Sequence, residues 1–297
     1  MQFGKVDDPG LVNFELPPDA PQTKIILAKH KSDEPFEVYV GCAKWNRAEL
    51  KGFYPRGTKD ELTYYATQFN SIELNATFYK MPDWQQIETW KNKTPEGFKF
   101  FPKLTGLISH YRRLINVKEP VDNFCNAISN FDDRLGMAFL QLHDNFKPKD
   151  FDRLEIVLNE FPKGVPLGVE VRNAEWFEEA NQNRLADFLE KHQMSNIIVD
   201  AAGRRDLLHM RLTNPLAFVR YVGANHASDT ERLDDWVDRI EKWREQGLKK
   251  LYFFVHQNIE LESPLLAEHF IQKVNERFGL SLHIPARQTT QQSMFEL

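Results

Sequence analysis

Acidic, basic and amide side chains recur at the ends of short apolar runs in this chain. Glu73 and Asn75 end a run that begins at Ser71, and Glu170 and Arg172 end another that begins at Pro166. Two carboxylates can serve as general acid and base when their surroundings separate their pKa values, and arginine binds phosphate or carboxylate through two parallel hydrogen bonds. Other polar side chains occupy equivalent places in further runs: Lys103, Gln141, His143, Asp200, Arg220, His256 and Asn258.

The alternation of side chains along each run predicts where these polar groups point. In 71–75, Ile72 and Leu74 alternate with Glu73 and Asn75, and alternate side chains of a strand face opposite sides. If the apolar set packs on outer helices, the polar set, Asp200 included, points inward and converges at the carboxyl ends of the strands. Buried charges need partners or a ligand. We therefore predict a ligand-binding or catalytic site there; a self-paired polar plug is the competing interpretation.

The residue types suggest separate roles within that site. We expect Glu73 and Glu170 to act as general acid and base, with Asp200 as a third catalytic carboxylate and His110 as a proton shuttle. The expected substrate-binding residues combine polar groups with rim aromatics: Asn75, Lys103, Gln141, Arg172, Arg220, His256, Asn258, Trp45, Tyr79 and Trp176.

Short apolar runs alternate with amphipathic stretches through most of the chain. The runs have strand length and are bounded by Gly, Pro or Asn, whereas the intervening stretches carry apolar residues at helical spacing. The expected strands are 37–42, 71–75, 98–103, 137–142, 166–171, 196–200, 217–222 and 250–255. The expected helices are 62–69, 83–93, 120–132, 151–161, 181–191, 233–243 and 266–278, with a further one in 201–214.

This alternation predicts an α/β fold of the (β/α)8 TIM-barrel type. Repeated strand–helix units imply parallel strands joined by right-handed crossovers, and eight strands favour a closed barrel. We expect one barrel domain over 36–283, preceded by an irregular extension over 1–35 and followed by a mobile tail over 284–297. No Gly-x-Gly-x-x-Gly follows any expected strand, which argues against dinucleotide binding.

Composition narrows the classes of partner. The formal net charge is −5, whereas broad nucleic-acid-binding surfaces are usually basic. No apolar stretch is long enough to cross a bilayer, no secretory signal is apparent, and the two cysteines, Cys42 and Cys125, have no metal-ligand spacing. We expect a cytoplasmic protein without membrane contact or a cofactor, with no metal ligand assigned; a divalent metal remains an alternative.

Several motifs resemble the YecE-like family, also called domain of unknown function 72. The resemblance covers roughly 38–278 and implies a barrel with its site at the strand ends, but it implies no reaction. This chain departs from the family pattern in Leu142-His143-Asp144, where Leu-Pro-Pro is usual, and in His256-Gln257-Asn258, where Asn-Asn-Asp is usual. The matching motifs are Gly41-Cys-Ala-Lys-Trp45, Gly52-Phe-Tyr-Pro55, Phe69-Asn-Ser-Ile-Glu-Leu-Asn-Ala-Thr-Phe-Tyr79, Leu140-Gln-Leu142, Val169-Glu-Val-Arg172 and Phe218-Val-Arg-Tyr-Val-Gly223.

Three basic residues among the acids favour an enzyme that acts on a small anionic or phosphorylated molecule. A hydrolase, lyase or isomerase reaction would suit general acid–base groups. Three alternatives stay open: a glycoside hydrolase using paired carboxylates, a metal-dependent isomerase-like or endonuclease-like barrel, and a protein that binds nucleic acid or phosphate without chemistry. The last alternative would use Arg112 and Arg113 in one loop and Arg204 and Arg205 in another. We predict no particular oligomeric state from the sequence.

Overall fold

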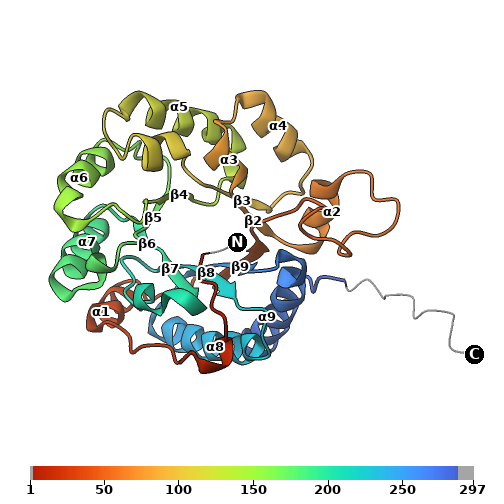
Figure 1. Cartoon of the computed structure of the whole chain (residues 1–297). Coiled ribbons are helices and arrows are strands. Elements are labelled where there is room, and N and C mark those ends of the chain that lie inside the picture. Colours follow the sequence, from red (N-terminus) through yellow and green to blue (C-terminus); the bar gives the residue numbers. More distant parts are fainter. Residues whose placement is uncertain (1–2, 287–297) are drawn as a thin grey trace, which may run out of the picture.

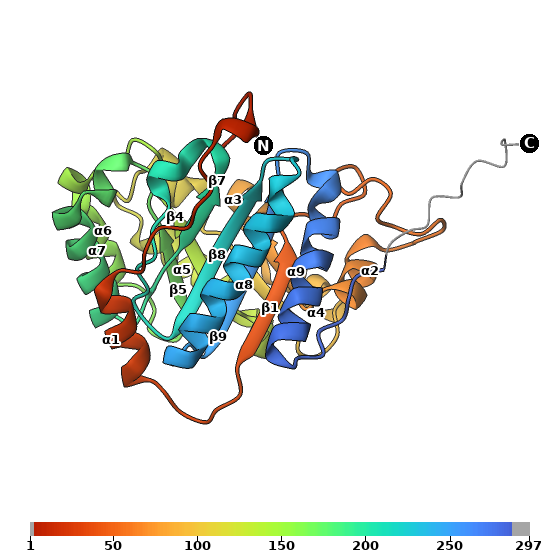
Figure 2. The same ribbon diagram turned by 90° about the horizontal axis from the view of Figure 1, so that it is seen from below.

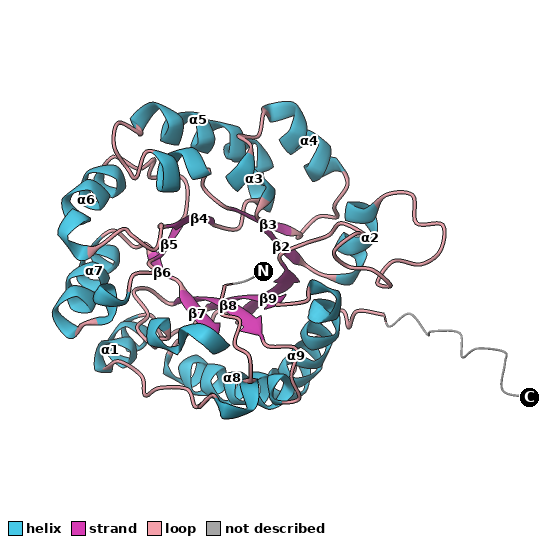
Figure 3. Cartoon of the chain, in the orientation of Figure 1, coloured by secondary structure: helices cyan, strands magenta, loops and turns pink. Residues whose placement is uncertain are grey.

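A computed structural model describes residues 3–286 of the chain as an α/β fold with parallel strands. The strands belong to three sheets, ordered β1-β9-β8-β7, β2-β3 and β4-β5-β6, and they stand around a common centre with helices outside (Figures 1 and 3). Their bounds are β1 Glu37–Cys42, β2 Ser71–Leu74, β3 Lys99–Pro102, β4 Ala138–Gln141, β5 Leu167–Glu170, β6 Ser195–Asn196, β7 Ile198–Ala201, β8 Leu216–Gly223 and β9 Lys250–Gln257.

Side chains and isolated bridges span the gaps between the sheets. Between β1 and β2, Asn70 donates from Nδ2 to the Val38 carbonyl at 2.8 Å and accepts from Val40 N at 2.9 Å. Between β3 and β4, parallel bridges pair Phe100 with Leu135 and Lys103 with Phe139. Neighbouring sheets are thus tied together without one continuous ladder, and the sheet is not closed.

The helices pack their apolar stripes on the outside of the strands. Leu233, Trp236, Val237 and Ile240 on α8 are buried, as the helical spacing predicted. Asp60 begins α2 and Asp83 begins α4, each accepting a backbone hydrogen bond at the N-cap. The helices are α1 Pro21–Lys29, α2 Glu61–Gln68, α3 Ala76–Tyr79, α4 Trp84–Asn92, α5 Lys118–Ile128, α6 Phe151–Asn159, α7 Glu179–Lys191, α8 Ser228–Gln246 and α9 Ser263–Phe278.

The expected strands agree with the observed ones to within two residues, except that the sixth is interrupted at Ile197 and appears as β6 and β7. The helix predicted in 201–214 is wrong: 202–207 forms a 3-10 helix, and the following segment is irregular. Both cysteines are buried and free of a disulfide. In the described part of the chain, no helix has the length and apolar character that a membrane crossing requires.

The N-terminal extension has more order than its prolines suggested. Its expected irregularity over 1–35 is wrong for 21–29, where Pro21 occupies the first turn of α1 and Thr23 bonds the Met210 carbonyl at 2.8 Å. The preceding segment runs past α8 toward the carboxyl ends of the strands (Figures 1 and 2). The expected tail over 284–297 lies outside the described residues from 287 onward.

Candidate functional site

Two layers of side chains fill the interior of the ring. The lower layer is apolar: Phe101, Phe139, Phe218 and Phe254 are fully buried and belong to one cluster. Two residues further along each of these strands stands a polar side chain, which faces the same way because strand side chains alternate. The upper layer therefore begins with Lys103 just after β3, Gln141 at the end of β4, Arg220 within β8 and His256 near the end of β9. Glu73 and Glu170 from β2 and β5 join it.

Arg220 holds the centre of this upper layer. Its guanidinium donates to Glu73 through Nε at 2.8 Å and NH2 at 2.7 Å, and through NH1 to Glu170 at 2.6 Å. Both carboxylates are 0% exposed. We call the connected set the mouth network; its members are Glu73, Asn75, Lys103, Gln141, Glu170, Arg172, Arg220, His256 and Glu260.

The carboxylates of the mouth network are held in the ionised state. Burial alone would raise the pKa of Glu73, but Arg220 and His256 hold it well below its usual range. Burial likewise opposes ionisation of Glu170, and Arg172, Arg220 and Lys103 outweigh it, so that its pKa falls to about 2. Glu73 and Glu170 are therefore poor candidates for proton transfer near neutral pH, contrary to the roles expected from the sequence.

His256 lies between two carboxylates. Its Nε2 is 3.0 Å from Glu73 and its Nδ1 is 3.8 Å from Glu260. Burial lowers the pKa of the imidazole, but Glu73 and Glu260 raise it more, and the net pKa shift is upward. When His256 is protonated, its charge and those of the two arginines balance the three glutamates of the network, and a proton on Lys103 then adds a positive charge in excess.

Lys103 is a buried amine beside that balanced set. Its Nζ donates to Gln141 Oε1 at 2.9 Å and lies 4.3 Å from the centre of the Phe78 ring. Among residues 3–286, no carboxylate forms an ion pair with Nζ. Burial and the neighbouring Arg220 and Arg172 lower the pKa of Lys103 to about 7. A substantial share of the amine is consequently neutral at physiological pH.

Arg172 marks the outer edge of the network. Its Nε donates to Glu170 at 2.5 Å, and its guanidinium lies 3.8 Å from the centre of the Phe3 ring. The two terminal nitrogens of Arg172 make no hydrogen bond to any residue between 3 and 286. The Phe3 segment is fixed nearby, because Gly203 N donates to the Gly4 carbonyl at 2.8 Å and a side chain at either glycine would collide. Among the described residues, Arg172 therefore leaves two terminal nitrogens without a hydrogen-bond partner beneath the Phe3 ring.

His110 stands on the rim next to Phe78. The two rings meet edge to face at 4.8 Å, the His143 ring is 5.1 Å from His110, and Ser109 Oγ is 2.8 Å from His110 Nδ1. Burial, Lys103 and His143 lower the pKa of His110 to about 4. His110 is thus neutral near pH 7, and its role as a proton shuttle stays a prediction.

Asp200 does not join the mouth network, so its predicted place in the site is wrong. Its neighbours Val199 and Ala201 face the inner apolar layer, which turns Asp200 outward toward α8. There its carboxylate accepts from Arg205, from Arg232 at 2.9 Å and from Trp236 Nε1 at 2.8 Å. We call Asp200, Arg205, Asp229, Arg232 and Trp236 the outer cluster.

The aromatic residues expected on the rim fall into different places. Trp176 is 1% exposed, donates to the Phe146 carbonyl at 2.8 Å and packs beneath a loop, so its predicted substrate contact is wrong. Trp45 packs edge to face on Trp90 of α4 at 5.9 Å. Tyr79 is 85% exposed beside Phe78. Phe78 contacts Lys103 and Phe3 contacts Arg172, and of these two aromatics the sequence did not single out Phe3.

The remaining expected residues lie close to the strand ends. Asn75 donates from Nδ2 to Glu73 Oε1 at 2.7 Å, and Asn258 follows β9 in a partly buried bend. Of the two arginine pairs considered for phosphate contacts, Arg204 and Arg205 bond Asp206 and Asp200, whereas Arg112 and Arg113 are exposed. Within 3–286, no group of three or more His, Cys, Asp or Glu side chains is arranged to hold a metal ion.

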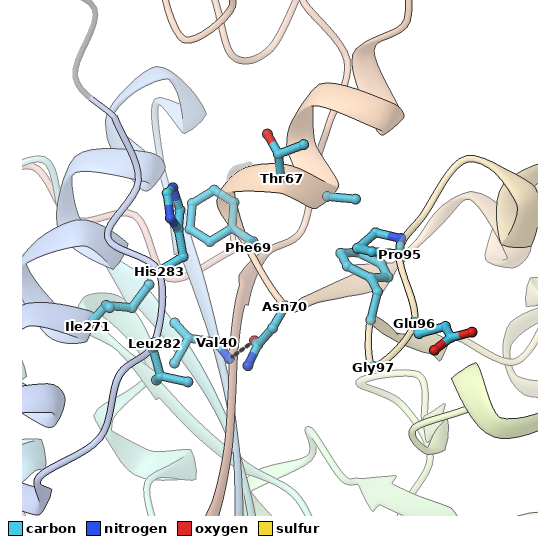
Figure 4. A pocket seen from close by; sticks show the side chains of 12 residues that line it. Val40, Thr67, Phe69, Asn70, Pro95, Glu96, Gly97, Ile271, Leu282 and His283 are labelled. Carbon is cyan, nitrogen blue, oxygen red and sulfur yellow. Dashed lines mark hydrogen bonds between the residues drawn. The ribbon is translucent and has the colours of Figure 1, made fainter.

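A separate pocket lies outside the strand ring. It opens between the end of α2, the turn at 95–98 and the segment after α9, and its lining is mainly apolar (Figure 4). The dashed bond in that view joins Val40 N to Asn70, the contact that ties β1 to β2. Because none of the mouth network lines this pocket, it belongs to the outer packing layer.

Comparison with known proteins agrees with the fold and locates the chain in a family. The family described as "Protein of unknown function DUF72" matches residues 39–291. The UPF0759 protein YecE of Escherichia coli K12 is 25% identical over 77% of this chain and 89% of its own length. The UPF0759 protein YunF of Bacillus subtilis 168 is 24% identical over 75% of this chain and 80% of its own length.

Solved structures show the same architecture. A DUF72 family protein of Thermotoga maritima superposes with a TM-score of 0.64 at 25% identity, covering 80% of this chain and 99% of the other. One from Enterococcus faecalis V583 gives a TM-score of 0.66 at 19% identity, covering 83% and 99%. The family's match to most of the chain, together with these relatives and their fold, shows that the chain belongs to the DUF72 family of proteins of unknown function.

Proposed function

We propose that this protein is an enzyme for a small anionic substrate, which binds at Arg172 and Lys103 above the carboxyl ends of the strands. The observation that carries the proposal is the donor capacity left unused there. Among the described residues, Arg172 donates a hydrogen bond to a carboxylate only through Nε, and Lys103 donates to the amide oxygen of Gln141. Arginine and lysine in such positions are suited to phosphate or carboxylate.

The charge balance supports the same proposal. With His256 protonated and Lys103 uncharged, the network is neutral, and an anion at Arg172 would add a negative charge that a proton on Lys103 can offset. With a pKa of about 7, Lys103 can exchange between its neutral and protonated forms near physiological pH, and His110 is a second neutral base on the rim. These two groups replace Glu73 and Glu170 in the proposed acid–base chemistry, because both carboxylates are tied to Arg220.

The competing functions receive less support. A glycoside hydrolase needs two carboxylates that flank an open space, whereas Arg220 stands between Glu73 and Glu170. Phosphate-backbone binding would use both arginine loops, but Arg204 and Arg205 are engaged in ion pairs with acids of their own segment and β7. A small ligand in the ring is therefore the function we propose.

We also infer that the three sheets work as one interrupted (β/α)8 barrel. The support is the single residue that separates β6 from β7, the bridges between β3 and β4, and the Asn70 link between β1 and β2. Rigid strands would hold the network cations in place without the ordering cost of a loop.

Thermal unfolding in the presence of anions tests the proposal. Phosphate, sulfate and a panel of phosphorylated and carboxylated metabolites should raise the Tm, by about 5 °C or more for a ligand at a hundred times its Kd. Arg172→Ala should remove the increase while the protein still folds. Arg184→Ala, a matched loss of an exposed arginine from α7, should leave it unchanged. Ligands that raise the Tm are then followed by NMR for turnover.

An unchanged Tm across the whole panel would contradict the proposal and favour a self-paired polar plug. A Tm increase that survives in Arg172→Ala would place the anion elsewhere. Binding without turnover of any bound ligand would leave the protein as an anion receptor and remove its assignment as an enzyme.

A further inference from the structure

Lys103 differs from the other cations of the mouth network in its partners. Arg172, Arg220 and His256 each contact a carboxylate, whereas Lys103 Nζ contacts the neutral Gln141 Oε1. Its side chain is 8% exposed and rises from the end of β3, beside the Phe78 ring. A buried amine without a counter-ion is the arrangement in which lysine serves as a nucleophile.

We propose that Lys103 is a catalytic nucleophile that forms a Schiff base with an aldehyde or ketone, and that the substrate is therefore a carbonyl compound that also bears an anionic group. This proposal rests on the proposed function for the anion at Arg172. It adds the second functional group of the substrate and assigns the covalent step to one atom, Nζ of Lys103.

The electrostatics of the site favour the neutral amine that such a step requires. Burial, Arg220 and Arg172 lower the pKa of Lys103 to about 7, whereas Glu170 and Glu73 act in the opposite direction. Glu170 and Glu73 do not restore an ordinary pKa to Lys103, because each of these carboxylates already forms an ion pair with an arginine. The contact with Phe78 favours the ammonium form, but a cation–π contact contributes only about 0.5–2 kcal/mol.

The covalent step is balanced without an oxidant or reductant. The lone pair of Nζ attacks the carbonyl carbon, a C–N bond forms, and the carbonyl oxygen takes a proton to give a carbinolamine. Loss of that oxygen as water, with uptake of one proton overall, leaves a protonated imine on Lys103. Its positive charge draws electrons from the neighbouring carbon, which assists proton removal or C–C cleavage, and the neutral His110 on the rim is placed to accept a proton.

Reductive trapping tests the nucleophile directly. The purified full-length protein is incubated at pH 7 with glyoxylate or pyruvate, each of which joins a carbonyl to a carboxylate, and with cyanoborohydride. Intact mass and peptide mapping then locate the reduced adducts. Lys103 should be modified at least about tenfold faster than the exposed lysines, because a free lysine side chain has a pKa of about 10.4 and is almost fully protonated at pH 7.

Two variants distinguish a reactive site from general labelling. Lys103→Met should lose the fast adduct, whereas Lys147→Met, which removes a lysine paired with Glu175 on the outside, should retain it. Arg172→Ala should slow trapping by both kinds of probe, because Arg172 helps to lower the pKa of Lys103. The slowing should be greater for the anionic probes than for acetaldehyde, which has no anion. Modification of Lys103 no faster than that of exposed lysines would overturn the proposal.

The outcome separates this proposal from the proposed function. Slow labelling of Lys103 in a protein whose Tm still rises with phosphate through Arg172 would remove the Schiff base and leave the anion site standing. Fast labelling of Lys103 without any anion-dependent Tm increase would retain the nucleophile and remove the anionic group from the expected substrate.

Discussion

The mouth network and the outer cluster are two buried charge clusters, one inside the strand ring and the other between β7 and α8. In the outer cluster, Asp200 accepts from Arg205, Arg232 and Trp236, and Asp229 accepts from the backbone amides of Ala224 and His226. Arg205 also donates to the Phe14 and Glu15 carbonyls. Its charges are balanced, and its carboxylates are surrounded by donors of the protein itself.

The mouth network resembles the outer cluster in its central arginine but differs from it at its outer edge. Arg220 is enclosed by Glu73 and Glu170 much as Arg232 is enclosed by Asp200 and Asp229. Beyond that centre, Lys103 lacks a counter-ion and the terminal nitrogens of Arg172 lack a hydrogen-bond partner within 3–286. Buried charge therefore does not by itself indicate a functional site, and the outer cluster also leaves one buried donor, Arg232 Nε, without a partner among the described residues. The distinguishing feature of the mouth network is that its spare donors belong to Lys103 and to the terminal nitrogens of Arg172, at the edge of the network.

Replacing the central arginine of the mouth network should have the largest effect on stability. Arg220→Met leaves Glu73 and Glu170 buried without their common partner, and breaking a buried ion pair costs about 3–5 kcal/mol. Urea unfolding at pH 7 measures the loss. Glu73→Gln combined with Arg220→Met should recover part of it, because one uncompensated charge is removed. A loss below about 1 kcal/mol would mean that water enters the ring and that the network is not buried.

Asp200→Asn should destabilise the protein without touching the anion site. The variant keeps the size of the side chain but removes the charge that balances Arg232 and Arg205, and we expect a loss of about 2–3 kcal/mol. The Tm increase caused by phosphate should be preserved. A variant that folds but no longer responds to phosphate would restore Asp200 to the site that the sequence predicted.

The strand boundaries were predictable because each strand is a short apolar run with clear breakers at its ends, and the site's location follows from the strand ends. The orientation of Asp200 could not be predicted from the sequence. The rule that apolar residues face the helices fails where the ring interior is itself apolar. On β7 both alternating sets contain aliphatic residues, and Val199 and Ala201 pack inward against the phenylalanine layer. The alternation alone gives no sign of which set is inside.

A sequence signal for the interior was present in the chain. Phenylalanine stands two residues before Lys103, Gln141, Arg220 and His256, so one aromatic layer lies below one polar layer on four strands. Near Asp200 the pattern is absent, since Ile198 occupies the equivalent position. The role of Phe3 could not have been found, because it depends on where a long extension returns to the ring.

The stability of the protein should depend on pH through Lys103. The folded-state pKa of this amine is lowered to about 7, whereas its ordinary value is 10.5, so between these values the unfolded chain binds more protons and stability rises with pH. Below about pH 7 the amine is protonated in the folded state as well, and the free-energy cost of burying its charge lowers the stability by its full amount. Lys103→Met removes this cost at every pH, and we expect it to stabilise the protein by about 1–2 kcal/mol at pH 7 after allowance for solvent relaxation.

The difference between wild type and Lys103→Met isolates this contribution, because other titrating groups are common to both. Among the charged groups facing the amine, Arg220 has a raised pKa and Glu73 and Glu170 have lowered ones, so these three stay ionised across the window, and His110 titrates below it. Urea unfolding in anion-poor buffers between pH 6 and 10.5 should show the two proteins converging as the pH rises. A constant difference would assign Lys103 an ordinary pKa.

Removing the aromatic cover from Arg172 should have the smallest effect on stability and should sharpen the contrast between the two clusters. Phe3 lies over Arg172 as Phe14 lies over Arg232, at 3.8 and 4.3 Å. A cation–π contact of about 0.5–1 kcal/mol must be lost if an anion displaces the Phe3 ring. Phe3→Ala should therefore lower the phosphate concentration at half-maximal Tm increase about two- to fivefold. Phe14→Ala should not change that concentration, since Arg232 is enclosed by Asp200 and Asp229. If Phe3→Ala instead weakens phosphate binding, the ring helps to hold Arg172 in its binding position, and the N-terminal segment is then a part of the site and not a cover over it.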